Sequence, residues 1–338
     1  MTEAANQTAL AGVPAPILEV EDLARYFRLK RRGLFGARET VKAVDGVSFT
    51  LKEGETLGLV GESGCGKSTT GRLVLGILPP TAGKVCFSGK DLAQLEDDDW
   101  RAVRLDLQMI FQDALSALDP RMTVATQVRE PLDIHEVGRM EERNRRVQEM
   151  LDAVVLPGGL AHRYPHELSG GQQQRVVIAR ALILEPRLIV CDEPVSALDV
   201  SVQAQVVNLL AELQRRFNVA YLFISHDLSV VRHISHRIGV MYLGRIVEEG
   251  KRDDLFDRPR HPYTRALLSA IPVPDPKVKR ERLILEGDPP SAIAPPSGCR
   301  FHTRCPFAEP VCSERTPELK PVGAYHRVAC HLVESGRL

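Results

Sequence analysis

The chain has 338 residues, enough to bury one large core with a smaller unit beside it. Its 44 Lys and Arg balance 44 Asp and Glu, so it lacks the global basic field that nucleic-acid binding uses, and we expect no nucleic-acid partner. No apolar run is long enough to span a bilayer and no signal peptide opens the chain, which predicts a cytoplasmic protein with at most a peripheral membrane role. Residues 1–15 are small and polar, and we expect a disordered leader there.

The first part of the chain predicts an antiparallel layer followed by a buried strand. Residues 17–27 and 41–52 have the pattern of short strands bounded by glycine-bearing loops. Residues 55–60, ETLGLV, form a compact apolar run that suits a fully buried strand. Residues 95–165 are charged and helical in pattern, with helix stops at Pro120, Pro131 and Pro157, and predict an inserted helical subdomain.

Strands and helices alternate in the second half of the chain. Residues 172–184 are helical in pattern, and 188–192 (LIVCD) and 220–225 (AYLFIS) predict two more buried strands. Asp199 is placed to cap a helix between them. The apolar face of that helix carries Val202, Val206, Leu209, Leu210 and Leu213. This alternation predicts an α/β fold with a parallel sheet. From about Pro259 the prolines multiply, which predicts a separate appendage and no more of the sheet.

A glycine loop follows the first buried strand directly. GESGCGKS, residues 61–68, fits G-x-x-x-x-G-K-[ST] and precedes a helical run. Its glycines let backbone N–H groups face phosphate oxygens, Lys67 supplies a charge for the β- and γ-phosphates, and the Ser68 hydroxyl can bind Mg²⁺. We therefore predict a nucleotide site. The residues assigned to it are Gly61, Glu62, Ser63, Gly64, Cys65, Gly66, Lys67, Ser68 and Thr69.

Cys65 lies inside this loop, and the first interpretation is that a small residue fits there. The loop amides and Lys67 are expected to lower the pKa of its thiol. Alkylation of Cys65 would then block nucleotide binding.

Two carboxylates end the second buried strand, where open α/β sheets present ligands. Asp192 would hold the Mg²⁺ shell, and Glu193 would polarise a water for attack on the γ-phosphate. His226 follows the third buried strand and is expected at the same edge of the sheet.

A second glycine pair, in LSGGQ at residues 168–172, also precedes a helix but has no lysine. It can bind a γ-phosphate that is already held elsewhere.

Together these motifs resemble the ATP-binding subunits of ABC transporters over about residues 17–255. Residues 61–68 match the Walker A loop, Phe111-Gln112 the Q-loop, 168–172 the LSGGQ signature, 188–193 Walker B, 196–199 the D-loop and His226 the H-loop. The resemblance implies an ABC ATPase domain of the P-loop NTPase fold at residues 16–256. Its parts would be a mostly parallel core sheet with helices, an antiparallel β layer, a helical subdomain at about 95–165 and a small cysteine-containing extension at 257–338.

The resemblance also implies roles for single residues. Lys67, Ser68 and Asp192 would hold phosphate and Mg²⁺, Glu193 would be the general base, and His226 would contact the γ-phosphate. Gln112 would sense the metal and relay its state to membrane subunits. The aromatic residue that stacks on adenine aligns with Phe27, with Tyr26 as the alternative. In the family two domains pack head to tail around ATP, and the residues that would meet the partner's nucleotide are Ser169, Gly170, Gly171, Gln172 and Asp199.

Residues 261–276 and 111–124 resemble the oligopeptide/dipeptide permease branch, which includes nickel importers. Residues 119–121, 130–132 and the LLSAIP tail are most like its second, F-type ATPase. The resemblance implies an ATP-hydrolysing subunit of a di-/oligopeptide importer at the cytoplasmic face of the membrane. Its partners would be two transmembrane permease subunits, a sister ATPase in a heterodimer or a second copy in a homodimer, and an extracytoplasmic solute-binding protein. A soluble ABC-type clamp on DNA or ribosomes is the alternative.

Four cysteines crowd the last forty residues: Cys299, Cys305, Cys312 and Cys330. Their wide spacing suits a zinc knuckle poorly, because such sites favour C-x2-4-C pairs. Four thiolates can hold an iron–sulfur cluster, and the branch resemblance implies a [4Fe-4S] cluster here. Zinc, four reduced thiols, or ligation by His302 or His326 are the alternatives.

Overall fold

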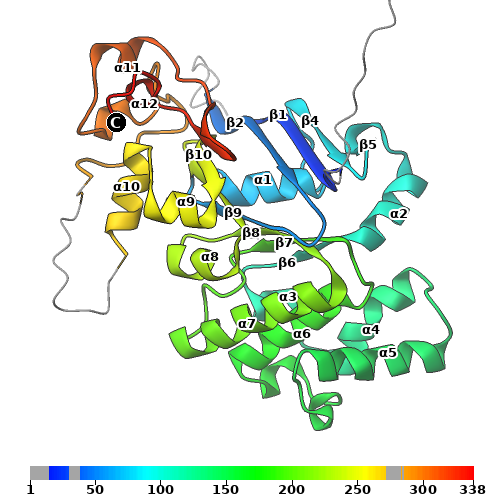
Figure 1. The fold of residues 1–338 in the computed structure, drawn as a ribbon. Coiled ribbons are helices and arrows are strands. Elements are labelled where there is room, and N and C mark those ends of the chain that lie inside the picture. Colours follow the sequence, from blue (N-terminus) through cyan, green and yellow to red (C-terminus); the bar gives the residue numbers. More distant parts are fainter. Residues whose placement is uncertain (1–14, 30–38, 272–282, 284) are drawn as a thin grey trace, which may run out of the picture.

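The computed structural model describes residues 15–29, 39–271, 283 and 285–338. The expected leader therefore lies outside the described residues, apart from Ala15. Two sheets organise the chain (Figure 1). The antiparallel layer has the order β2 (Thr40–Leu51), β1 (Leu18–Arg28), β4 (Ala82–Phe87) and β5 (Lys90–Asp91). The core sheet has the order β11 (Lys320–Gly323), β12 (His326–Val328), β10 (Arg245–Lys251), β9 (Arg237–Tyr242), β3 (Thr56–Val60), β8 (Ala220–Ile224), β7 (Leu188–Asp192) and β6 (Leu107–Ile110).

The centre of the core sheet is parallel, as predicted. Strands β9, β3, β8, β7 and β6 pair in parallel, and β3, β7 and β8 are buried at every position. Their side chains alternate between two apolar clusters, so both faces of the sheet are covered. Ile189 and Tyr221 pack toward the helices, whereas Leu188 and Leu222 pack toward the antiparallel layer.

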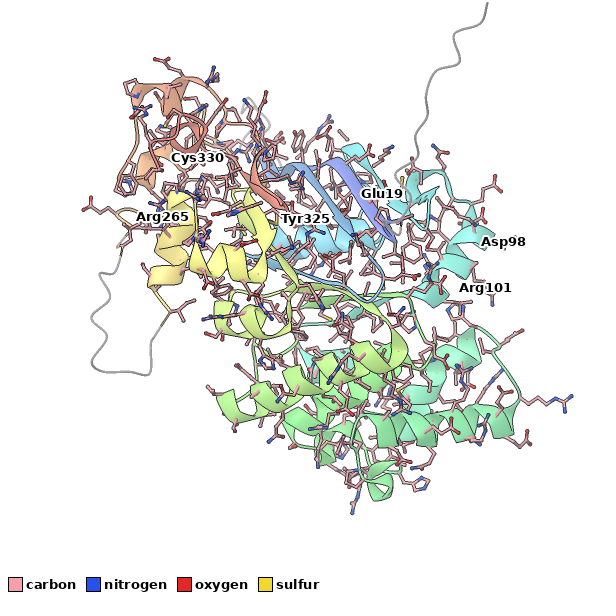
Figure 2. The ribbon with its side chains drawn as sticks, viewed as in Figure 1. Glu19, Asp98, Arg101, Arg265, Tyr325 and Cys330 are labelled. Carbon is pink, nitrogen blue, oxygen red and sulfur yellow. The ribbon has the colours of Figure 1, made fainter. Side chains whose placement is uncertain are left out.

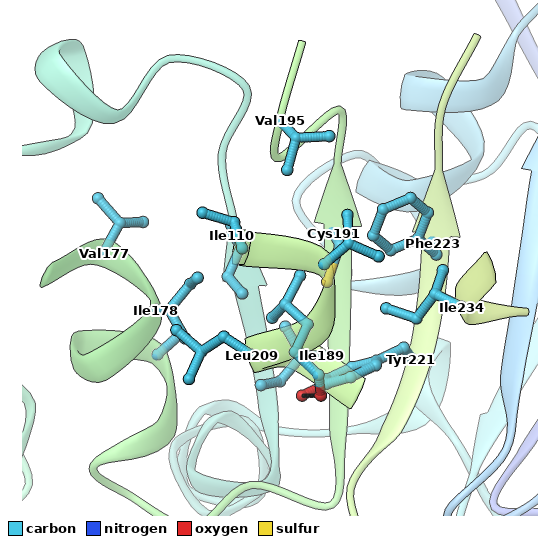
Figure 3. Packing of buried hydrophobic residues seen from close by; sticks show 14 of the residues in the cluster. Ile110, Val177, Ile178, Ile189, Cys191, Val195, Leu209, Tyr221, Phe223 and Ile234 are labelled. Atoms are coloured by element: carbon cyan, nitrogen blue, oxygen red, sulfur yellow. Dashed lines mark hydrogen bonds between the residues drawn. The ribbon is translucent and has the colours of Figure 1, made fainter. Parts of the chain in front are cut away.

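The apolar cluster that contains Ile189 and Tyr221 includes side chains of the helices α6 (Gly170–Leu182), α7 (Val200–Phe217) and α8 (Leu228–Ile234). Figure 3 shows Ile178 of α6 and Ile234 of α8 near the side chains of β7 and β8. The predicted face of α7 is confirmed: Val206, Leu209, Leu210 and Leu213 are buried and Val202 packs against them. Asp199 occupies the cap position of α7, but its side chain makes no capping hydrogen bond.

The predicted helical subdomain contains α2 (Asp97–Asp106), α3 (Ala114–Ala117), α4 (Val124–Ile134) and α5 (Met140–Ala153). Two expectations for it were wrong. Pro131 lies inside α4, where the His135 N–H donates to the Pro131 carbonyl at 3.1 Å and continues the helix. The segment 107–110 is the strand β6, because its backbone pairs with β7.

The appendage expected outside the sheet extends it. Besides α9 (Arg252–Asp257), α10 (Pro262–Ser269), α11 (Pro310–Glu314) and α12 (His331–Glu334), the C-terminal part supplies β11 and β12. Strand β12 pairs antiparallel with β10, so that Glu248 lies opposite Val328. His326 of β12 also contacts the buried Glu248 carboxylate at 2.8 Å. The proline-rich stretch ends before these strands, so its composition did not reveal them. Within the described ranges, every helix is too short or too polar to cross a bilayer.

Candidate functional site

A pocket of about 490 Å³ lies at the carboxyl edge of the parallel strands, between β3 and α1 (Lys67–Val74). Loops after β3, β6, β7 and β8 all reach it, as expected for ligand sites in α/β sheets. Its lining residues are Val41, Ala43, Ser63, Gly64, Gly66, Lys67, Ser68, Thr69, Gln112, Glu193, His226 and Ala292. The structure thus brings together most of the residues predicted for the nucleotide.

The glycine loop has the shape of a phosphate cradle. Gly66 precedes α1 with φ +109°, and a Cβ there would lie 2.2 Å from the Ala43 carbonyl oxygen, so the position requires glycine. Lys67 is 4% exposed, and its ammonium donates to the carbonyls of Gly61 at 2.8 Å and Glu62 at 3.0 Å. The buried ammonium is therefore held by the loop itself, within reach of anything that binds at the N-terminus of α1.

Ser68 lines the pocket and contacts the buried Asp192. The Ser68 hydroxyl donates to Oδ1 of Asp192 at 2.7 Å. Burial raises the pKa of Asp192, more than the hydrogen bond from Ser68 lowers it. A buried carboxylate of this kind is stabilised by a cation, so these two residues fit the Mg²⁺ of MgATP.

Glu193 is the meeting point of two other loops. Gln112 donates to its Oε2 at 3.1 Å, and Nδ1 of His226 lies 3.2 Å from the same oxygen. The Glu193 backbone has φ +49°, the left-handed region, and its N–H donates to the Ile224 carbonyl at 2.9 Å. With this backbone conformation the Glu193 side chain lines the pocket. A carboxylate held in this way can accept a proton from a water.

The two candidates for adenine stacking differ in their surroundings. The Tyr26 hydroxyl donates to Asp45, and this hydrogen bond raises the pKa of Tyr26. Phe27 pairs across the strands with Val41, which lines the pocket, so the two side chains share one face of the layer. Neither aromatic ring lines the pocket itself.

The LSGGQ loop lies outside the pocket. Ser169 caps α6 through a reciprocal pair with Gln172, at 3.4 and 3.0 Å. Ser169 and Gly170 are exposed, and Gly171 packs against Val202 at the start of α7. None of the residues at 169–172, nor Asp199, lines the pocket of its own chain.

The expected lowering of the Cys65 pKa was wrong. Its side chain is buried against Gly61, and burial raises the pKa of the thiol more than Lys67 lowers it. The loop therefore keeps Cys65 as a neutral thiol.

The structure does not support the iron–sulfur cluster or zinc. Cys299 is close to the other three cysteines of the group, but among the described residues no three His, Cys, Asp or Glu side chains form a metal-binding group. Burial raises the pKa of Cys299 to about 12 and of Cys305 to about 11, which favours protonated thiols. The imidazole of His302 contacts the Cys299 carbonyl, and that of His326 contacts Glu248, so each ring has a hydrogen-bonding partner that is not a cysteine sulfur.

Residues that the sequence did not mark also belong to the site. Ala292, from the C-terminal part, lines the pocket, and its carbonyl accepts from the Lys42 N–H at 3.0 Å. Tyr263 and Arg304 both contact Glu62 of the glycine loop. These contacts depend on segments that are distant in sequence, so no motif or periodicity signals them.

Two family models match the chain. The model of the ABC transporter family matches residues 44–196, and the model of the oligopeptide/dipeptide transporter C-terminal region matches residues 247–312.

Curated relatives extend over nearly the whole chain. The oligopeptide transport ATP-binding protein AppF of Bacillus subtilis is 56% identical over 320 residues, which cover 94% of this chain and 97% of that protein. OppF of Salmonella typhimurium is 54% identical over 325 residues, covering 94% of this chain and 96% of that protein.

Among solved structures, a dimeric post-hydrolysis state of the ATP-binding cassette MJ0796 bound to ADP and Pi is similar, with a TM-score of 0.62 and 32% identity. It covers 70% of this chain and 98% of that chain. CbiO1 from Clostridium perfringens, part of the transporter complex cbiONQ, matches with a TM-score of 0.62 and 27% identity over 72% of this chain and 91% of that chain.

Proposed function

The chain belongs to the ABC transporter ATP-binding proteins, in the oligopeptide/dipeptide branch, and we propose that its pocket beneath residues 61–68 binds and hydrolyses the ATP that powers peptide import. The fold is the ABC ATPase fold of the P-loop NTPases. One observation carries the assignment of the site: Lys67, Ser68 and Glu193 with its two contacts line one pocket, and Ser68 donates to the buried Asp192.

In the proposed binding mode the loop amides and Lys67 receive the β- and γ-phosphates. Lys67 would exchange its bonds with the Gly61 and Glu62 carbonyls for phosphate oxygens, which costs little because the ammonium is already buried and oriented. Ser68 and Asp192 would hold the Mg²⁺ that enters with ATP, and Gln112 reaches the same pocket. Phe27 is the better candidate for adenine, since Tyr26 is bonded to Asp45.

For hydrolysis we assign Glu193 as the general base. Its carboxylate would accept a proton from the water that attacks the γ-phosphate, while Gln112 and His226 orient it. His226 would contact the γ-phosphate directly, because its half-exposed ring also lines the pocket. Hydrolysis converts ATP to ADP and phosphate, which then leave the pocket.

The site is completed by a second ATPase domain in this proposal. The LSGGQ loop is exposed and lies outside its own pocket, and Val200 beside Asp199 is 82% exposed. Two domains packed head to tail would bring Ser169, Gly170 and Gly171 to the partner's ATP and cover Val200. The similar structure of MJ0796 is dimeric. We propose a sister ATPase as the partner, with a homodimer as the other arrangement.

The membrane partners follow from the relatives, which are oligopeptide transport proteins. The protein works with membrane permease subunits as a peripheral component. We propose two such subunits, a solute-binding protein outside the membrane, and docking at the cytoplasmic face. A groove beside the Q-loop, lined by Phe111, Ile77, Trp100 and Arg180 among others, is the candidate docking surface, since Phe111 and Ile77 are exposed apolar residues.

We take residues 16–256 as the ATPase domain and 257–338 as its extension. The match of the C-terminal family model to residues 247–312 supports a boundary near this point. The alternative of a soluble clamp on DNA or ribosomes is not favoured, because relatives over 94% of the chain are transport proteins.

Replacement of Glu193 by Gln tests the assignment. We expect ATP turnover to fall at least about a hundredfold while MgATP binding persists, because the amide keeps the shape but cannot accept the proton. Glu149→Gln, on the exposed side of α5, is the matched control. Hydrolysis by Glu193→Gln at the wild-type rate would show that another group is the base.

The same variant tests the partners. A tagged Glu193→Gln chain, purified from detergent-solubilised native membranes with MgATP, should co-elute with two multi-span proteins and a sister ATPase. Recovery of ribosomes, DNA or only soluble proteins would contradict the transporter assignment.

A further inference from the structure

We propose that the C-terminal extension is part of the nucleotide site, with Tyr263 and Arg304 as positioning residues that hold Glu62 and thereby the phosphate-binding loop. The inference rests on the proposed function of that loop in binding ATP. It assigns a role in ATP use to a region that lies after the ATPase motifs in the sequence.

Glu62 is anchored twice by the extension. Its backbone N–H donates to the Tyr263 hydroxyl at 2.9 Å. Its two carboxylate oxygens accept from Nη1 of Arg304 at 2.9 and 3.2 Å. The side chain and the backbone of one loop residue are thus fixed by α10 and by the turn at residues 302–304. A doubly held residue has little freedom to shift.

The Arg304–Glu62 pair is more than a surface contact. The Arg304 side chain is 8% exposed and that of Glu62 is 28% exposed. Among the described residues Glu62 is the one acidic partner of Arg304, and the guanidinium also approaches the Tyr242 hydroxyl at 3.5 Å. A buried guanidinium requires its counter-charge, so loss of either partner leaves an uncompensated charge beside the loop.

A rigid aromatic group supports these anchors. The ring centroid of Tyr263 lies 4.7 Å from that of Tyr242 and 5.4 Å from that of Phe301, and Phe301 lies 5.3 Å from Tyr242. Tyr263 and Phe301 are buried. Figure 2 labels Arg265 on α10 and Cys330 before α12, which both lie at this end of the core sheet. The rings join α10 and the segment that contains Phe301 to β9, so Tyr263 and Arg304 have a fixed base.

The anchored residue contacts Lys67, the proposed phosphate-binding lysine. The Glu62 carbonyl accepts from Lys67 at 3.0 Å, and residues 63–66, which carry the loop amides, follow it directly. The other side of the loop is held by the Gly244 N–H, which donates to the Cys65 carbonyl at 2.8 Å. Gly244, between β9 and β10, therefore holds the loop at Cys65, and the extension holds it at Glu62. Release of Glu62 would misplace Lys67 and the amides together.

The test uses the full-length chain and measures the Kd for MgATP, the KM and kcat of ATP hydrolysis, and Tm. For Arg304→Gln we expect Kd and KM to rise about tenfold, with a smaller change in kcat. Tyr263→Phe keeps the ring and removes the oxygen that accepts the Glu62 N–H, so a rise of about threefold is expected. Arg304→Lys keeps the charge and should recover part of the loss. Arg337→Gln removes the Arg337–Glu309 ion pair of the same extension and should match the wild type.

A double-mutant cycle with Glu62→Gln separates loop positioning from general loss of stability. If Arg304 acts through Glu62, Arg304→Gln adds little to the Kd change of Glu62→Gln. Fully additive effects, or an unchanged Kd and KM in Arg304→Gln with only a lower Tm, would overturn the proposal. If Arg304→Gln does not fold, the comparison of Glu62→Gln and Tyr263→Phe with Arg337→Gln still decides it: unchanged Kd in both overturns it. A wild-type chain that neither binds nor hydrolyses ATP would instead contradict the proposed function.

Discussion

Gln112 donates a hydrogen bond to Glu193 across 3.1 Å and joins two loops that are 81 residues apart in the sequence. Gln112 follows β6, which lies between α2 and α3 of the helical subdomain in the chain. A movement of that subdomain would therefore shift Gln112 and its hydrogen bond to the proposed base.

Replacing Gln112 by Ala should therefore reduce kcat about tenfold and leave the Kd for MgATP within about twofold. Steady-state hydrolysis and equilibrium binding on the same preparation measure both. Gln148→Ala, on the surface of α5, is the control for a lost amide. Loss of ATP binding in Gln112→Ala would mean that this residue acts on the nucleotide and not on Glu193.

The assignment of the adenine contact can be tested with two alanine variants. Phe27→Ala should weaken ATP binding about five- to tenfold, the lower part of the range for base–aromatic stacking. Tyr26→Ala should lower Tm by removing the hydrogen bond to Asp45 but keep the affinity for ATP. Titration with a fluorescent ATP analogue measures the affinity of both variants, and thermal unfolding measures their Tm. The reverse pattern would assign adenine to Tyr26.

The extension should be sensitive to acid. Burial lowers the pKa of His261 to about 4, from 6.5, although the charge of Glu248 opposes this. Between these values the unfolded chain binds a proton that the folded chain does not, so the free energy of unfolding decreases as the pH falls. The decrease can reach roughly 3 kcal/mol between pH 6.5 and pH 4.

His261→Asn should flatten this decrease. Asn can still accept from the Tyr263 N–H at the start of α10, as His261 does at 3.1 Å, but it cannot bind the proton. Urea unfolding at a series of pH values compares the slopes, and the exposed His162→Asn is the control. An equally steep decrease in His261→Asn would place the acid sensitivity in other groups.

Cys65 should react slowly with thiol reagents in spite of its position beside Lys67. Its burial raises the pKa and excludes the reagent, so iodoacetamide should label it at least about tenfold more slowly than a free cysteine at neutral pH. Peptide mass spectrometry over a time course measures the rate, with the chain in denaturant as the reference. Rapid labelling of Cys65 in the native chain would mean that the loop opens readily.

Much of the fold was predictable because its signals are local. The strand at residues 188–192 and the buried face of α7 follow from short-range hydrophobic patterns, and both were confirmed. The loop at 61–68 is equally local, because a glycine turn between a strand and a helix needs no distant partner.

The remaining features depend on distant neighbours. Residues 107–110 become β6 because β7 lies beside them, although the surrounding sequence is charged and helical. Arg304 lies among cysteines, and its sequence does not reveal that Glu62, 242 residues earlier, is its partner. The raised pKa of Cys65 has a similar origin, since the sequence shows Lys67 nearby but not the burial that outweighs it.

The pairing of β12 with β10 has a consequence for synthesis. A ribosome delivers Glu248 long before His326, its partner 78 residues further along the chain. During that interval β10 has an unpaired edge of backbone N–H and C=O groups, and the Glu248 carboxylate has no imidazole beside it. The nascent ATPase would therefore pass through a stage prone to association with other chains. Arrival of β12 ends this stage, and the strand thus protects the sheet against aggregation as well as completing it.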